Sequence, residues 1–141
     1  MKMTNSIKLT VVALTATLGL ATVGTAQEAK PTLPPASTKQ NVTYASDIKA
    51  ILDESCVKCH SGDRPKGRLK LDTLADVLKG GKNGKILKPG DSANSYVVKA
   101  IAHLTSDQHA WMPPLNNMAH IKPLTPDQIG LIRAWIDQGA K

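Results

Sequence analysis

The sequence predicts one all-α domain of about four short helices joined by long loops. Apolar residues recur at helical spacing in four separate stretches, and no stretch alternates between apolar and polar residues as a β-strand does. Between these stretches lie segments rich in proline and glycine, which keep the helices short. The chain contains no phenylalanine, two tyrosines and two tryptophans. A core with so few large side chains is easier to fill if an apolar cofactor occupies its centre.

The N-terminus has the layout of a secretory signal peptide. Lys2 and Lys8 precede an apolar, threonine-rich run that ends in small residues at Ala26. This pattern predicts a signal peptide over residues 1–26 and an exported or periplasmic protein. The alternative is an uncleaved anchor, but a spanning helix needs about 20 consecutive apolar residues and this run is shorter. We therefore expect no membrane span after cleavage.

Residues 27–43 have the composition of a linker. The stretch 27–42, "QEAKPTLPPASTKQNV", holds three prolines and shows no hydrophobic period. It predicts a flexible, proline-rich tether, and it leaves residues 44–141 as a single folded domain.

The charge balance points to a protein partner. Cleavage after Ala26 would remove two lysines and lower the formal charge of +7 by two units. The remaining excess is mild, and no aromatic residues are interleaved with the basic ones, so nucleic acid is not an expected partner. A local positive patch that faces an acidic protein is the better explanation.

Helix signals stand at four places. The spacing of Ile48, Ile51 and Leu52 predicts a helix from about residue 47 into the cysteine motif, capped by Ser46 or Asp47. A short helix is expected within residues 71–81, and another from 92 to about 104.

The second and fourth helices carry the clearest end signals. Asp72 or Thr73 is placed to cap the second, and two glycines at 80–81 end it. In the fourth, Thr125 is the expected cap, Pro126 takes the first helical position, and Gln128 completes a capping box before a glycine at 139.

Both cysteines of the chain lie in the stretch "CVKCH". Cys56 and Cys59 are three residues apart, which places them on one face of a helix, and His60 follows directly. Two thiols at this spacing can each form a thioether with a porphyrin vinyl group, and the adjacent imidazole then reaches the iron. The motif predicts one covalently bound haem c with His60 as a ligand, its Nδ1 proton held by a backbone carbonyl.

Two other chemistries compete for the same motif. An exported protein can carry a disulfide or a thioredoxin-like dithiol, but no βαβ pattern surrounds the cysteines. A closed zinc site needs four ligands, and the chain has no second CxxC.

The sixth iron ligand has several candidates. Met112 precedes Pro113 and Pro114, which hold it extended and make the loop stiff. Met118 is a second candidate, but a methionine at such a position usually fills space in the core. His103 is expected at the polar edge of a helix. Bis-histidine ligation stays open, because two further histidines share the loop with Met112: His109 and His120. That loop, "AWMPPLNNMAHIKPL", is long and aperiodic, as functional loops often are.

Several separated blocks of the chain resemble the cytochrome c family, and more narrowly its planctomycete-type domain. The blocks are "ILDESCVKCH", "KGRLKLDTLADVLKGG", "LKPGDSANSYVVKAI", "MPP" and "LIRAWIDQGA", and the resemblance covers roughly residues 44–141. It implies a small class I-like fold in which the first and last helices cross beside the haem, with Trp135 near the crossing. It also implies His60 and Met112 as axial ligands. The loop after "MPP" is longer than usual, which would bring Met118 and His120 close to the haem pocket.

These features predict one-electron transfer rather than catalysis. With both axial positions filled, the iron has no open site for a substrate. The chain would be a monomeric carrier or, alternatively, the dedicated haem subunit of an exported oxidoreductase. A haem enzyme or sensor with an open distal site is the alternative from another class. Five basic residues near the motif are expected to form a collar that steers an acidic redox partner: Lys58, Arg64, Lys66, Arg68 and Lys70.

Overall fold

The structure, a computed structural model, describes residues 31–141, and the predicted signal peptide lies outside them. This part of the chain is all-α, as predicted, and contains no β-strand, only one isolated bridge between Gly81 and Gly84. The four α-helices are α1 (Lys49–Ser55), α2 (Leu74–Lys79), α3 (Tyr96–Ile101) and α4 (Pro126–Asp137). Three shorter turns accompany them: a π-turn η1 (Tyr44–Ile48) and two 3₁₀-turns, η2 (Lys66–Arg68) and η3 (Gln108–Ala110).

The first helical segment starts three residues earlier than expected. Thr43 is its cap, because the Thr43 side chain accepts a hydrogen bond from the Ser46 N–H. The prediction of Ser46 or Asp47 as the cap is therefore wrong. The Asp47 carboxylate instead reaches back to accept the Thr43 N–H at 3.0 Å, while the Asp47 N–H donates to the Thr43 backbone carbonyl at 3.1 Å.

The end signals of α2 and α4 are confirmed. Thr73 caps α2 by accepting from the Asp76 N–H, and Gly80 ends it with a φ of 84°. At the start of α4, Thr125 and Gln128 form the reciprocal capping box, with Pro126 in the first turn. Local sequence is enough to define these ends, because each partner lies within three residues of the other.

The helix α3 is shorter than the expected span of 92–104. Ser95 precedes it but does not cap it, because its hydroxyl donates to the Asp91 carbonyl at 2.8 Å and accepts from the Lys88 N–H at 2.9 Å. These bonds fold the preceding loop into a compact, buried turn. At the other end His103 adopts a φ of +55°, which takes the chain out of the helix.

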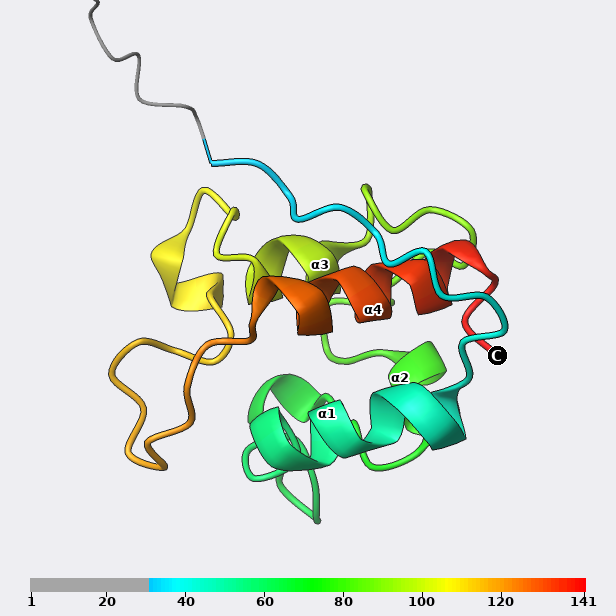
Figure 1. Cartoon of the computed structure of the whole chain (residues 1–141). Coiled ribbons are helices and arrows are strands. Elements are labelled where there is room, and N and C mark those ends of the chain that lie inside the picture. The colour runs from blue at the N-terminus through cyan, green and yellow to red at the C-terminus, as the bar shows by residue number, and fades with distance from the viewer. Residues whose placement is uncertain (1–30) are drawn as a thin grey trace, which may run out of the picture.

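The core lies between α4 and the segments on either side of it. In Figure 1, α4 crosses the molecule with α3 behind its upper edge and α1 below it. The largest fully buried apolar side chains are those of Ile48, Val98, Trp135 and Ile136. Their burial places η1, α3 and α4 around one core.

Residues 33–42 run along α4, as the blue-to-cyan segment of Figure 1 shows. The Ser37 N–H donates to the Gly130 carbonyl at 2.9 Å, and the Gln138 side chain donates to the Lys39 carbonyl at 2.8 Å. Val42 is buried. This part of the segment expected to be a tether therefore packs against the domain. Within residues 31–141 no helix has the length and apolar character needed to cross a membrane.

Candidate functional site

The cysteine motif forms a turn at the end of α1 rather than a continuation of the helix. Cys56 stands at the C-cap with a φ of −127°, and its carbonyl accepts the N–H groups of Cys59 at 3.1 Å and His60 at 3.0 Å. The expectation that Cys56 and Cys59 lie on one face of a helix is wrong, because the helix ends at Ser55. The tight turn nevertheless brings all three side chains to the wall of one cavity.

This cavity has a volume of about 150 Å³ and an apolar wall. Its wall includes Cys56, Cys59 and His60 from the motif, and Met112 and Pro113 from the long loop. Aliphatic side chains from the intervening segments complete the wall: Leu69, Leu71, Ile86, Val97 and Ile101. The cavity thus brings together two sulfurs, an imidazole and a thioether in surroundings with few competing polar groups.

A second hollow, of about 490 Å³, continues from the first. The two share His60, Leu69, Ile86, Tyr96 and Met112 in their walls. The first cavity alone is smaller than the roughly 300–1,000 Å³ of typical ligand pockets. A macrocycle attached at the cysteines would therefore extend from the apolar cavity into the second hollow, where Lys66, Lys82 and Lys85 make the wall polar.

The imidazole of His60 is oriented by the backbone. Its Nδ1 lies 3.1 Å from the Lys66 carbonyl oxygen and 3.3 Å from that of Leu69. Both neighbours are acceptors, so Nδ1 carries the proton and Nε2 keeps the lone pair that a metal needs. Burial lowers the pKa of His60, and the two carbonyl contacts do not fully offset it. The ring is therefore held neutral and in the tautomer suited to a metal ligand.

The cysteines lack the signature of a reactive dithiol. Burial, together with the neighbouring Cys59, raises the pKa of the Cys56 thiol to about 11. Redox-active cysteines have the opposite property, a lowered pKa in an electropositive setting. Cys56 and Cys59 form no disulfide with each other. Across residues 31–141, no three His, Cys, Asp or Glu side chains come together as a set of metal ligands.

Met112 is the only one of the candidate sixth ligands that lines the cavity. Its backbone N–H donates to the Ala100 carbonyl at 3.0 Å, which ties the loop to the last turn of α3. Pro113, directly after it, is buried. The stiff, extended backbone expected before two prolines is thus anchored from both sides of Met112.

The other candidates lie elsewhere. Met118 is 96% exposed, and His109 and His120 are also exposed and contribute nothing to the cavity wall. The long loop therefore does not bring Met118 and His120 to the pocket. His103 is partly buried and stacks on Trp111 instead of facing the cavity.

Sequence reasoning missed several residues of the site. Tyr96, within the helix expected from 92 to about 104, is 54% exposed and lies at the junction of the two hollows. Leu69, Leu71 and Ile86 fell in segments interpreted as loops or helix edges. The alternation of leucines in "RLKLD" was a usable signal, because residues two apart in extended chain point to one side.

Comparison with known proteins finds a match to one family model. Residues 56–116 match the family model described as Planctomycete cytochrome C. The matched segment begins at the first cysteine and includes the cavity wall as far as Met112 and Pro113. No curated protein and no solved structure matches the chain significantly.

Proposed function

Since residues 56–116 belong to the Planctomycete cytochrome C family, we propose that this chain is an exported electron carrier with one haem c. The family supports haem-based electron transfer in general. The finer proposal is that His60 and Met112 are the axial ligands and that the chain is a carrier rather than an enzyme. The observation that carries it is the shared cavity, whose apolar wall contains Cys56, Cys59, His60 and Met112 together.

Different residues of the chain would attach the cofactor and orient its ligand. Each thiol of Cys56 and Cys59 would add across one vinyl C=C bond, forming an S–C bond while the thiol hydrogen goes to the other vinyl carbon. The carbonyls of Lys66 and Leu69 keep the His60 ring in one orientation. Bound haem would supply an iron that changes its oxidation state by one electron.

The remaining features suit a carrier. A thioether as sixth ligand raises the reduction potential relative to a second histidine. The aliphatic wall excludes water from the ligands, and the apolar surroundings favour the less charged, reduced state of the site. The exposed Tyr96 and the open second hollow leave an edge of the site accessible to a partner.

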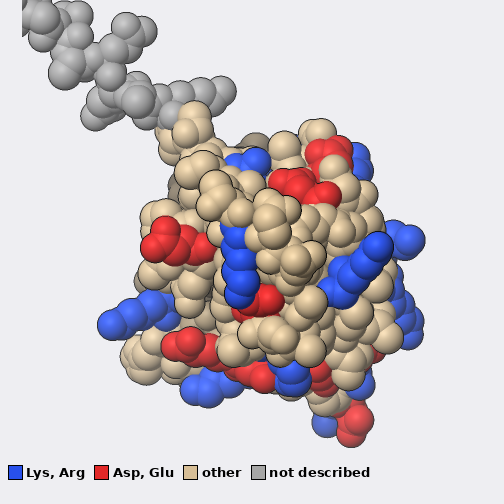
Figure 2. Space-filling view, turned by 45° about the vertical axis from the view of Figure 1, so that its right-hand side comes forward, with Lys and Arg blue, Asp and Glu red and all other residues tan. Residues whose placement is uncertain are grey.

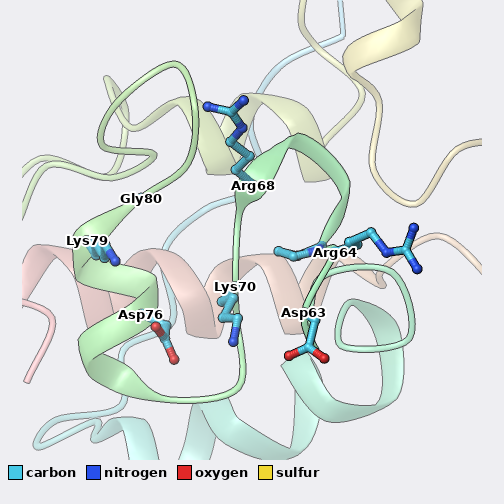
Figure 3. A pocket seen from close by; sticks show the side chains of 8 residues that line it. Asp63, Arg64, Arg68, Lys70, Asp76, Lys79 and Gly80 are labelled. Carbon is cyan, nitrogen blue, oxygen red and sulfur yellow. The ribbon is translucent and has the colours of Figure 1, made fainter.

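The proposed partner has an acidic docking face. The basic collar is defined as the five basic residues within and just after the motif in the sequence: Lys58, Arg64, Lys66, Arg68 and Lys70. Figure 3 shows the guanidinium groups of Arg64 and Arg68 pointing away from each other, with Asp63 and Asp76 near Lys70. Such a divergent arrangement suits a diffuse positive field better than the capture of one small anion. On the face shown in Figure 2, basic and acidic side chains are interspersed.

The test is haem retention by the protein expressed with its export signal in a host that can attach haem c. We expect haem to resist acid–acetone extraction from the parent and to be extracted from a Cys56→Ser/Cys59→Ser variant. Haem that is fully extractable from the parent would contradict the proposal.

Axial ligation is tested separately by spectroscopy. The ferric parent should show the weak long-wavelength charge-transfer band of Met–iron ligation, and Met112→Ala should abolish it. Met118→Ala, at an exposed position, is the matched control and should keep the band. Carbon monoxide should bind the ferrous Met112→Ala variant but not the ferrous parent. Binding to the parent would favour the sensor or enzyme with an open site.

A further inference from the structure

The loop between α3 and Met112 is closed by two contacts that join the same two stretches of chain. The Met112 N–H donates to the Ala100 carbonyl at 3.0 Å. Within the loop that this bond closes, the rings of His103 and Trp111 stack with centroids 4.9 Å apart and planes only 4° from parallel. Trp111, the residue next to Met112, is thus held against His103, which lies just beyond the end of α3.

Trp111 is also held from the loop side. Its indole Nε1 donates to the Thr105 carbonyl at 3.3 Å. The turn η3 just before it is capped by Asp107, whose carboxylate accepts the His109 N–H at 2.9 Å. The indole therefore lies between a hydrogen-bond acceptor at its edge and the imidazole on its face, and it has little freedom to move.

The position of the His103 ring is explained by the stack. Its Nε2 is buried and has no hydrogen-bond partner among the described residues, so no polar contact of that atom selects this placement. Its backbone is in the left-handed region, with a φ of +55°, a conformation in which His, Asn and Asp are enriched. Burying an unpaired polar atom is unfavourable, and packing against the flat face of Trp111 is the contact that offsets it.

We propose that His103 is a positioning residue for the sixth iron ligand: by stacking on Trp111 it holds the Met112 side chain in the cavity. This inference rests on the proposed function, since it takes Met112 to be the ligand. The backbone of Met112 is then fixed at three successive points: the Trp111 stack before it, its own N–H bond to Ala100, and the buried Pro113 after it. Without the stack, the loop keeps one fewer anchor and the thioether leaves the iron more often.

The test compares two substitutions at one position in the holoprotein. His103→Asn removes the ring but tolerates the positive φ, so backbone strain does not confound it. His103→Phe restores an aromatic face that can stack, but at some backbone strain because Phe rarely adopts a positive φ, so a retained band in this variant is a stringent result. His109→Asn, at an exposed position in η3, is the matched control. The readouts are the Met–iron charge-transfer band, carbon monoxide binding to the ferrous protein, and the exchange rate of the Met112 amide hydrogen.

We expect His103→Asn to weaken the band, to admit carbon monoxide and to speed exchange of the Met112 amide by about tenfold, given the usual strength of an aromatic stack. His103→Phe and His109→Asn should resemble the parent. If the parent shows the band, Met112→Ala loses it, and His103→Asn is unchanged in all three readouts, the positioning role is wrong while the proposed function stands. If the parent has no Met–iron band, both fail.

A folding defect is recognised by covalent haem content and helical circular dichroism, which should be unchanged. Should His103→Asn fail to accumulate, the pair Trp111→Phe and Trp111→Leu tests the same contact from the other side. Phenylalanine keeps a ring face and should retain the band, and leucine should not. Equal loss in both variants would overturn the stack as the positioning device.

Discussion

The rings of Tyr44 and Trp135 lie 6.2 Å apart between centroids, with their planes tilted by 46°. Tyr44 opens η1 and Trp135 belongs to α4, so the contact joins the start of the domain to its last helix. The Lys141 carbonyl accepts both the Tyr44 N–H and the Trp135 indole N–H, each at 2.9 Å. The first and last helical segments therefore pack together with Trp135 at their contact.

The hydroxyl of Tyr44 is expected to add nothing to stability. It is buried and has no hydrogen-bond partner within the described residues. Tyr44→Phe should leave the free energy of unfolding at neutral pH unchanged or slightly raised, since it removes an unpaired buried polar group. Tyr44→Ala should lower that free energy by about 3–5 kcal/mol. Urea unfolding measures both, and a large loss in Tyr44→Phe would show that the hydroxyl has a partner.

The burial of Tyr44 also predicts that the protein loses stability at alkaline pH. Burial raises the pKa of its phenol above the ordinary value. Above about pH 10 the unfolded chain therefore loses this proton before the folded chain does, and stability falls as pH rises through that range. Tyr44→Phe should show a shallower decline in urea midpoint above that pH. Tyr96→Phe, at an exposed position, is the control and should follow the parent.

Gly130 tests whether residues 33–42 pack on α4. A β-carbon at Gly130 would lie 2.7 Å from the Pro35 carbonyl oxygen, closer than atoms can approach. Gly→Ala in a helix normally stabilises by roughly 0.5–1 kcal/mol, so the sign of the change decides the question. We expect Gly130→Ala to destabilise the protein and to speed exchange of the Ser37 amide, which bonds to Gly130. If Gly130→Ala instead stabilises the protein by roughly 0.5–1 kcal/mol, residues 33–42 do not pack against α4 at this position.

The Asp137 carboxylate is predicted to stabilise the fold by satisfying Ser92. It accepts the Ser92 N–H at 2.8 Å and the Ser92 hydroxyl at 2.9 Å, and Ser92 is almost fully buried. Asp137→Ala would leave both donors without this acceptor, at a cost of about 1–3 kcal/mol in the free energy of unfolding. Asp53→Ala breaks only an exposed pair with Lys49 and should cost less than about 1 kcal/mol. Equal costs would contradict the prediction.

The basic collar predicts the salt dependence of electron transfer. Oxidation of the ferrous protein by anionic ferricyanide should slow as ionic strength rises, because screening weakens the attraction. Arg68→Glu should lower the rate at low salt, and Lys88→Glu, an exposed lysine outside the collar and both hollows, should lower it less. A cationic oxidant such as tris(phenanthroline)cobalt(III) should show the opposite trends. If the oxidation rate does not change with ionic strength for either oxidant, the basic collar does not steer the redox partner.

Local signals in the sequence predicted the parts of the fold that depend on near neighbours. The ends of α2 and α4 were predicted at Asp72 or Thr73, Gly80, Thr125 and Gln128, and the structure selects Thr73. These ends are predictable because each cap bonds to a residue three or four positions away. The early start at Thr43 and the shortened α3 were missed. In both cases a side chain with capping chemistry had two possible backbone partners, and the choice between them depends on how the loop folds.

The sequence by itself determined the chemistry: two thiols, an imidazole and a Met–Pro–Pro loop, at spacings that suit one covalent haem. Only the tertiary structure decided which sulfur and which nitrogen share a cavity, since Met112 reaches it while Met118, His109 and His120 remain exposed. Burial, the carbonyls that orient His60 and the His103–Trp111 stack all join residues separated by a turn or a loop. Such contacts depend on the path of the folded chain, which local periodicity and spacing do not contain.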